Sequence, residues 1–176
     1  CKIGLKVLAS GLLQADFPDF VDRALRTWSV PPGRVVIGIH ETAIAGSLDR
    51  VKDTLARLKR LGLRLGIDGF ATGASSLSNL AQLPFDELKL SAAFVTDMQR
   101  TALHGKIVRA LVRLARDLGL HLTAEGVADG ETVLALLALG CERVQGTHVS
   151  PPLTAEEILV FEKSGSGLAK LRLSDL

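Results

Sequence analysis

Hydrophobic positions along this chain follow two periods, and the two periods alternate from one end to the other. Residues 2–8 have period two, with Ile3, Leu5 and Val7 on one face, which is typical of a β-strand. Apolar residues at three- and four-residue spacing follow, and they predict a helix with one buried face. Because this change of period recurs to the end of the chain, we predict a regular alternation of strands and helices.

Six segments are predicted to be strands, each followed by a helix: residues 2–8, 34–39, 63–68, 87–90, 120–125 and 142–145. The helices carry end signals. Asp16 and Asp129 stand where N-caps are expected, and Gly62, Gly119 and Gly140 stand where helices are expected to stop. Strict alternation needs right-handed crossovers, so it predicts a parallel sheet that is either doubly wound or part of a barrel.

One domain accounts for most of the chain. Its 176 residues are of single-domain size, and 47% of them are hydrophobic, which suffices for one core. Thr154 and Glu157 form a capping box that opens the last predicted helix. Glycine and serine alternate at 164–167. We therefore predict a domain over residues 1–163 and a linker-like tail over residues 164–176.

Composition excludes several classes of protein. Aromatic residues make up 4% of the chain, with no Tyr, which leaves almost no platform for stacking nucleic-acid bases. The longest strongly apolar stretch, 133–139, is far shorter than the roughly 20 residues of a membrane span. Two cysteines cannot build a disulfide framework. We predict no nucleic-acid partner, no membrane span in this chain, and a location in the reducing cytoplasm.

Polar side chains stand at the ends of the predicted strands, where a parallel sheet gathers its ligand groups. They are His40 and Glu41, Asp68, Lys89, Glu125, and Gln145 with His148. Carboxylates and a lysine that converge on one edge suit a cation, a phosphate group or both. A buried ion pair of Lys89 with Asp68 and Glu125, or capping of the following helices, would explain the same residues. The spacing leaves both interpretations open.

Four segments at these strand ends resemble, in order, the motifs of one family. Residues 67–77 are similar to its DDFGTGYSSL, 87–89 to its ELKID, 124–127 to its AEGVE and 144–146 to its VQG. The chain thus resembles the EAL domain of bacterial cyclic di-GMP phosphodiesterases. The resemblance implies an α/β fold, a TIM-type (β/α) barrel of eight strands. The six predicted strands correspond to the last six, so we expect a partial barrel of about six βα units, without the N-terminal part that carries the Glu-Ala-Leu signature.

The resemblance also implies a site built on two divalent ions, Mg or Mn, of the kind that activates a water for phosphodiester hydrolysis. Several ligand positions of that site carry other residues: Leu8 replaces an Asn, Gly38 a Glu, Gly69 an Asp and Ser91 an Asp. The matching remnants are Asp68, Lys89, Glu125 and Glu41. With so few oxygen ligands, we predict no metal site, no cofactor and no functional catalytic residue, and thus that the chain is not an enzyme.

The leading hypothesis is therefore a degenerate, catalytically inactive EAL domain that acts as an interaction or regulatory module in bacterial cyclic di-GMP signal transduction. Its partner would be a second copy in a dimer, or another signalling domain or protein. The resemblance assigns dimerisation to a loop with Phe70, Thr72, Ser75 and Ser76.

Two alternatives remain. The first is a non-catalytic cyclic di-GMP receptor that binds through Asp68, Glu125, Gln145 and Gly146. The second is a metal-dependent cyclic di-GMP phosphodiesterase.

Overall fold

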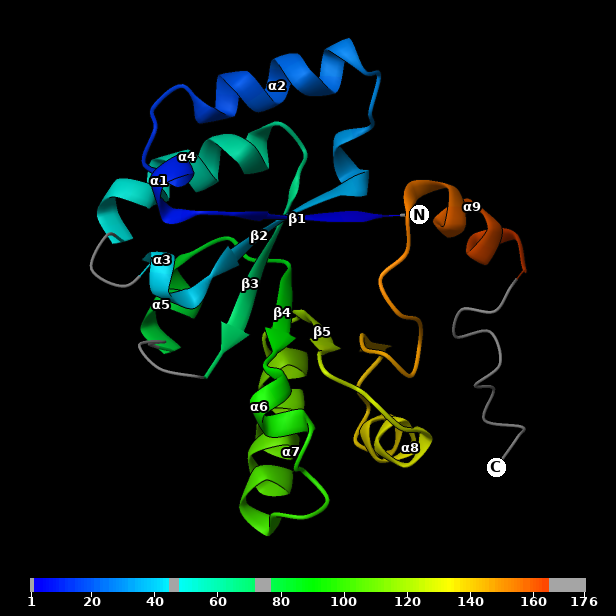
Figure 1. Ribbon diagram of the computed structural model, residues 1–176. Helices are drawn as coiled ribbons and strands as arrows, with labels where there is room; N and C mark the ends of the chain where they lie inside the picture. The colour runs from blue at the N-terminus through cyan, green and yellow to red at the C-terminus, as the bar shows by residue number, and fades with distance from the viewer. Residues whose placement is uncertain (1, 45–47, 72–76, 165–176) are drawn as a thin grey trace.

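One parallel sheet forms the centre of the computed structural model, which describes residues 2–44, 48–71 and 77–164 (Figure 1). Among these residues the strands are β1 (Ile3–Val7), β2 (Val35–His40), β3 (Arg64–Phe70), β4 (Glu87–Leu90), β5 (His121–Ala124) and β6 (Arg143–Val144). Each strand pairs in parallel with the next one in the sequence. All six strand predictions are confirmed, with boundaries that differ by one or two residues.

A helix follows every strand, and all but the last of these helices lead on to the next strand. The longer ones are α2 (Phe17–Thr27), α4 (Leu48–Arg60), α7 (Ala102–Asp117), α8 (Gly130–Ala138) and α9 (Ala155–Ser164), together with the shorter α5 (Leu77–Gln82). Four single turns were not predicted: α1 (Ala9–Leu12), the 3₁₀ turn η1 (Pro32–Arg34), α3 (Glu41–Ile44) and α6 (Ala92–Val95). Three of them, α1, α3 and α6, come directly after strands, where they shape the carboxyl edge of the sheet.

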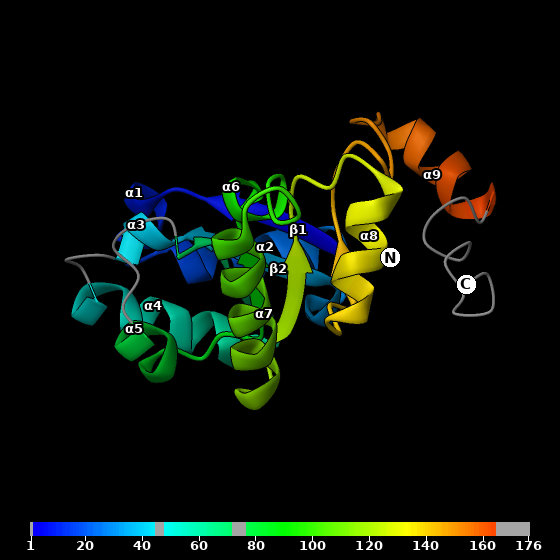
Figure 2. The ribbon, with the colours of Figure 1, turned by 90° about the horizontal axis from the view of Figure 1, so that it is seen from below.

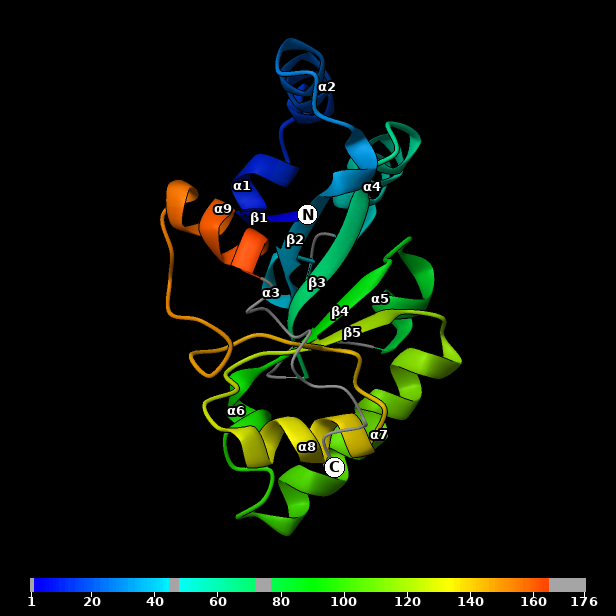
Figure 3. The same cartoon turned by 90° about the vertical axis from the view of Figure 1, so that its right-hand side faces the viewer.

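The strand order decides between the two predicted architectures. A doubly wound sheet reverses its order at a switch point, whereas a barrel adds each strand to the same edge. The order here is β1-β2-β3-β4-β5-β6, without reversal. Figure 3 shows the sheet fanned between α2 at one end and α7 and α8 at the other. The chain is therefore an α/β half-barrel, and the predicted fold class, a partial TIM-type barrel, is confirmed.

Burial differs sharply between neighbouring strands. Five residues of β2, from Val35 to Ile39, are buried, whereas four of the five residues of β1 are exposed. Within the described part of the chain, β1 pairs with β2 alone, so one of its edges carries unpaired backbone groups. The side chains of Ile3 and Leu5 remain about half exposed.

The helix-end predictions are confirmed with one exception. Gly62, Gly119 and Gly140 adopt positive φ angles two residues after the last residues of α4, α7 and α8. Asp129 accepts a hydrogen bond from the Thr132 backbone N–H at 2.7 Å.

Asp16 precedes α2 but makes no capping hydrogen bond, so that part of the prediction is wrong. Its backbone is already helical, and Pro18 near the start of α2 has no N–H to donate to a cap. The predicted capping box of Thr154 and Glu157 forms at α9, with contacts of 2.7 and 3.3 Å.

The last helix, α9, does not pack beside the other helices. Figures 1 and 2 both place α9 on the opposite side of the sheet from α4. The tail predicted for residues 164–176 lies almost wholly outside the described residues, so the domain boundary stays a prediction. In the described part of the chain, no helix is long and apolar enough to cross a membrane.

Candidate functional site

Lys89 joins three strands at the carboxyl edge of the half-barrel. Its Nζ donates to Glu125 Oε1 at 3.0 Å and to Gln145 Oε1 at 3.2 Å. Asp68 Oδ1 lies 3.9 Å from the same nitrogen. The structure thus brings Asp68, Lys89, Glu125 and Gln145 together, as the strand-end spacing predicted. We call these four residues the strand-end site.

Asp68 is the buried member of this site. Its side chain is 3% exposed, and Oδ1 makes no hydrogen bond with any described residue. Oδ2 lies 3.4 Å from the Nζ of Lys6, which extends from β1. A buried carboxylate oxygen without a hydrogen bond is costly, and such groups are found where a ligand completes the site.

Lys6 was missed in the search for strand-end residues. The signal was nevertheless present, because the alternation of Ile3, Leu5 and Val7 leaves Lys6 on the opposite face of β1, toward Asp68. A cavity of about 540 Å³ lies along this inner face, and Lys6, Asp68, Lys89 and Gln145 all line it.

The other candidate residues have local roles in the fold. Glu41 is buried, and its Oε2 accepts a hydrogen bond from the backbone N–H of Ala71 at 3.1 Å, where the chain has a positive φ. A Cβ at Gly146 would lie 2.1 Å from the carbonyl oxygen of Val127, so only glycine fits there. Both residues therefore fix backbone next to the site.

The predicted dimerisation loop is only partly described. Phe70 is buried in the core at 3% exposure. Thr72, Ser75 and Ser76 lie outside the described residues. The role of this loop stays a prediction.

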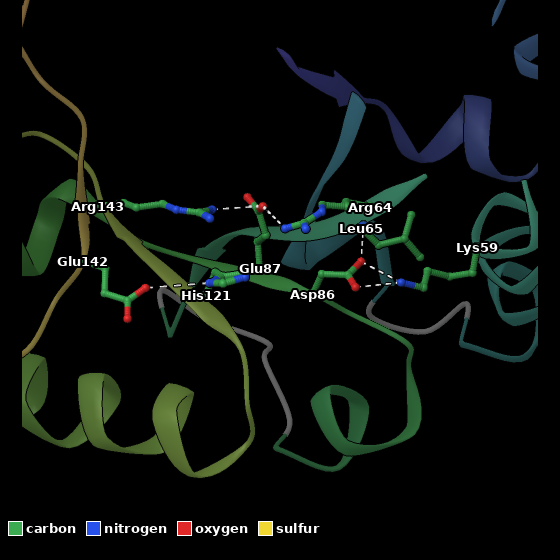
Figure 4. Close-up of polar contacts among 8 residues, drawn as sticks. All are labelled: Lys59, Arg64, Leu65, Asp86, Glu87, His121, Glu142 and Arg143. Atoms are coloured by element: carbon green, nitrogen blue, oxygen red, sulfur yellow. Dashed lines mark hydrogen bonds and ion pairs between the residues drawn. The ribbon is translucent and has the colours of Figure 1, made fainter. Parts of the chain in front are cut away.

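A second polar cluster lies toward the amino end of the sheet (Figure 4). Glu87 Oε1 is 3.0 Å from Arg143 Nη1 and 3.6 Å from Arg64 Nη1. Beside it, Asp86 accepts hydrogen bonds from Lys59 Nζ at 2.7 Å and from the backbone N–H of Leu65 at 2.8 Å. We call Glu87, Arg64 and Arg143 the amino-end network. It ties β3, β4 and β6 together.

The chain belongs to the EAL domain family, whose model matches residues 1–152. It is 34% identical to the cyclic di-GMP phosphodiesterase NbdA of Pseudomonas aeruginosa, over 86% of this chain and 19% of NbdA. It superposes on the solved phosphodiesterase MucR of the same organism in a cyclic di-GMP complex, with a TM-score of 0.85 and 32% identity over 89% of this chain and 64% of that one.

A third relative was solved with a metal ion. BlrP1 of Klebsiella pneumoniae, in a complex with manganese and cyclic di-GMP, matches with a TM-score of 0.81 and 30% identity, over 86% of this chain and 39% of that one. The chain spans about a fifth of the length of the curated relatives that it matches. The recognised family is therefore confirmed: this chain is an EAL domain.

The prediction that the chain is not an enzyme is contradicted by these relatives. NbdA and MucR are both named cyclic di-GMP phosphodiesterases, and they match this chain along most of its length. The replacement of residues at several ligand positions was not sufficient evidence for a loss of catalysis. Positioning and electrostatic stabilisation by the remaining residues also lower a reaction barrier, so substitutions at ligand positions do not by themselves establish a loss of catalysis.

The described residues do not provide a complete set of ligands for a divalent ion. Across residues 2–44, 48–71 and 77–164, no group of three or more His, Cys, Asp or Glu side chains lies close enough to hold one. The positive charge beside Asp68 and Glu125 comes from Lys89. The BlrP1 complex contains manganese, so members of this family do bind divalent metals. The absence of a cofactor from this chain stays a prediction.

Proposed function

We propose that this chain is part of a cyclic di-GMP phosphodiesterase domain and that its strand-end site binds the dinucleotide. The observation that carries the proposal is the meeting of Lys89 with Asp68, Glu125 and Gln145 at the carboxyl edge, where barrels place their ligands. The relatives named above supply the substrate and the reaction class.

Each side chain has a chemical use toward a phosphodiester. The Lys89 ammonium would neutralise charge that develops on the phosphate as the water oxygen bonds to phosphorus and an ester P–O bond breaks, releasing the alcohol oxygen. Asp68 and Glu125 supply carboxylates that can orient the attacking water or accept its proton. Gln145, with donor and acceptor on one amide, suits a base edge or a ribose hydroxyl.

The experiment measures cyclic di-GMP affinity by calorimetry and hydrolysis by chromatography, with Mn²⁺ present, for the wild type and for Lys89→Met. We expect binding to weaken by about 10- to 100-fold in the variant, as for loss of a charged hydrogen bond. Lys59→Met is the matched control, because Lys59 is also a partly buried, ion-paired lysine but lies toward the amino end of the sheet.

Equal losses in both variants would mean that the strand-end site is structural. Failure of the wild type to bind cyclic di-GMP in any condition would refute the proposal. A cytoplasmic location is part of this proposal, because Cys141 is a free, buried thiol, as is common in proteins of a reducing compartment.

We also propose self-association through β1. An apolar groove of about 550 Å³ runs between β1 and α2, lined by Ile3, Leu5, Phe20 and Trp28 among others. These four side chains are more than half exposed. A second copy is the occupant that we favour, because two-fold pairing would cover the unpaired edge of β1 and the groove in both copies at once.

Sedimentation velocity at micromolar concentration tests this second proposal. We expect a dimer for the wild type and a monomer for Trp28→Ser. Leu103→Ser is the control, because Leu103 is similarly exposed but lies on α7, away from the groove. A wild type that stays monomeric over the whole concentration range would refute self-association.

A further inference from the structure

Two glycines, Gly38 and Gly69, stand at the carboxyl edge where the resemblance to the family implies ligand side chains, and a polar side chain lies beside each. A Cβ built on Gly69 would lie 2.8 Å from His40 Nε2, so the imidazole occupies the space that a side chain at 69 would need. A Cβ built on Gly38 would lie 3.2 Å from Asp68 Oδ2, and Gly38 is the register partner of Lys6 on the adjacent strand. His40 and Asp68 therefore take up the space of the lost ligand side chains, and Lys6 lies beside Asp68.

Lys6 brings positive charge to the buried carboxylate. Its Nζ is 3.4 Å from Asp68 Oδ2, while its side chain is 72% exposed, so the ammonium can still contact a ligand from solution. Lys89 approaches the other oxygen of Asp68 from the opposite direction. Lys6 and Lys89 together balance the charges of Asp68 and Glu125, so this edge lacks the excess negative charge that holds a divalent cation, and the exposed Lys6 ammonium can pair with an anion.

His40 carries a hydrogen-bond donor at the same edge of the sheet as Lys6 and Asp68. The backbone N–H of Thr42 donates to His40 Nδ1 at 3.4 Å, and Thr42 Oγ1 lies 2.8 Å from the same nitrogen. Because an N–H can only donate, Nδ1 is the acceptor and the ring proton is assigned to Nε2. Nε2 is thus a hydrogen-bond donor above Gly69, and Asp68 is the register partner of His40.

Lys6, His40, Thr42 and Asp68 all line one cavity of about 440 Å³. We propose that Lys6 and His40 bind a phosphate group of the ligand at this cavity without a divalent cation. This inference rests on the proposed function for the identity of the ligand, cyclic di-GMP. Lysine neutralises the phosphate charge, and the imidazole N–H donates to a phosphate oxygen.

The test measures cyclic di-GMP affinity by calorimetry in excess EDTA and again with Mn²⁺. We expect the wild-type Kd to agree within about twofold between the two conditions. In EDTA, Lys6→Met should weaken binding by about 10- to 100-fold and His40→Gln by about 10-fold. Lys6→Arg should restore most of the affinity, because it retains the charge.

The controls are Lys52→Met, an exposed lysine on α4, and His121→Gln, a histidine paired with Glu142 toward the amino end of the sheet (Figure 4). Both should bind as the wild type does, and circular dichroism melts should show every variant folded. Binding that EDTA abolishes in the wild type would overturn the inference. So would wild-type affinity in both Lys6→Met and His40→Gln. An absence of binding with and without Mn²⁺ would instead refute the proposed function.

Discussion

Asp68 and Glu87 are two buried carboxylates on the inner face of the same sheet, and they differ in how well their partners satisfy them. Each lies between two cationic side chains. Glu87 is within 3.0 Å of Arg143 and 3.6 Å of Arg64. Asp68 has Lys6 at 3.4 Å and Lys89 at 3.9 Å, and its Oδ1 makes no hydrogen bond among the described residues.

This difference separates stability from function. Removal of a buried carboxylate that contacts two guanidinium groups leaves the arginines unpaired, and this loss of a partner destabilises the fold. A buried oxygen with no hydrogen bond costs free energy in the unliganded protein. The amino-end network is thus complete without a ligand, whereas the strand-end site is not.

Removal of Glu87 should have the largest effect on stability. We expect Glu87→Ala to lower the free energy of unfolding by about 2–3 kcal/mol, somewhat below the ~3–5 kcal/mol of a fully buried pair. The reduction reflects the arginine side chains, which are 33% exposed and regain some hydration. Urea unfolding measures it. A loss below about 1 kcal/mol would show that the amino-end network contributes little.

Gly69→Ala tests how tightly the carboxyl edge is packed. The positive φ of +68° and the imidazole of His40 both oppose a side chain there. We expect a loss of about 2 kcal/mol in urea unfolding. In a His40→Ala background, the same substitution should cost about 1 kcal/mol less, because only the backbone strain remains. Additive losses would show that His40 does not occupy this space.

Asp68→Asn sharpens the comparison, because it removes charge while keeping shape. We expect the free energy of unfolding to change by no more than about 1 kcal/mol, because Lys89 retains its hydrogen bonds to Glu125 and Gln145. The Lys6 ammonium, which loses its partner, is hydrated by solvent. The matched Glu87→Gln variant should lose more free energy of unfolding than Asp68→Asn. A larger loss for Asp68→Asn than for Glu87→Gln in urea unfolding would show that Asp68 contributes more to stability than Glu87.

Asp129 provides a third, exposed carboxylate with complete hydrogen bonds. The backbone N–H of Thr132 holds its pKa below the usual value. A lowered pKa means that the charged cap stabilises the fold above the unfolded-state pKa and ceases to do so as the pH falls through the folded-state pKa. Asp129→Ala should therefore lower Tm at pH 7, and the gap should close below about pH 4. Asp129→Ser should behave like the wild type at pH 7, because serine also caps.

Local signals predicted the elements of this fold well. Strand and helix boundaries follow from period-two and period-3.6 patterns, and helix ends follow from glycines that can adopt positive φ, such as Gly62 and Gly119. The convergence of Asp68, Lys89 and Glu125 followed from the rule that parallel strands gather ligands at their carboxyl ends. These features depend on a few consecutive residues or on a general rule of topology.

Other features were decided only by the tertiary structure. The choice of barrel winding over a doubly wound sheet depends on which edge each strand joins, which no local pattern records. The missing cap at Asp16 reflects a backbone already helical before Pro18. Lys6 reaches Asp68, and His40 fills the space above Gly69, because β1, β2 and β3 align in one particular register. The sequence by itself determined which strands and helices form and which polar residues stand at the carboxyl edge, because these depend on local periodicity. The ion-pair and hydrogen-bond partners of each charged residue were decided by the tertiary structure, because they lie far apart along the chain.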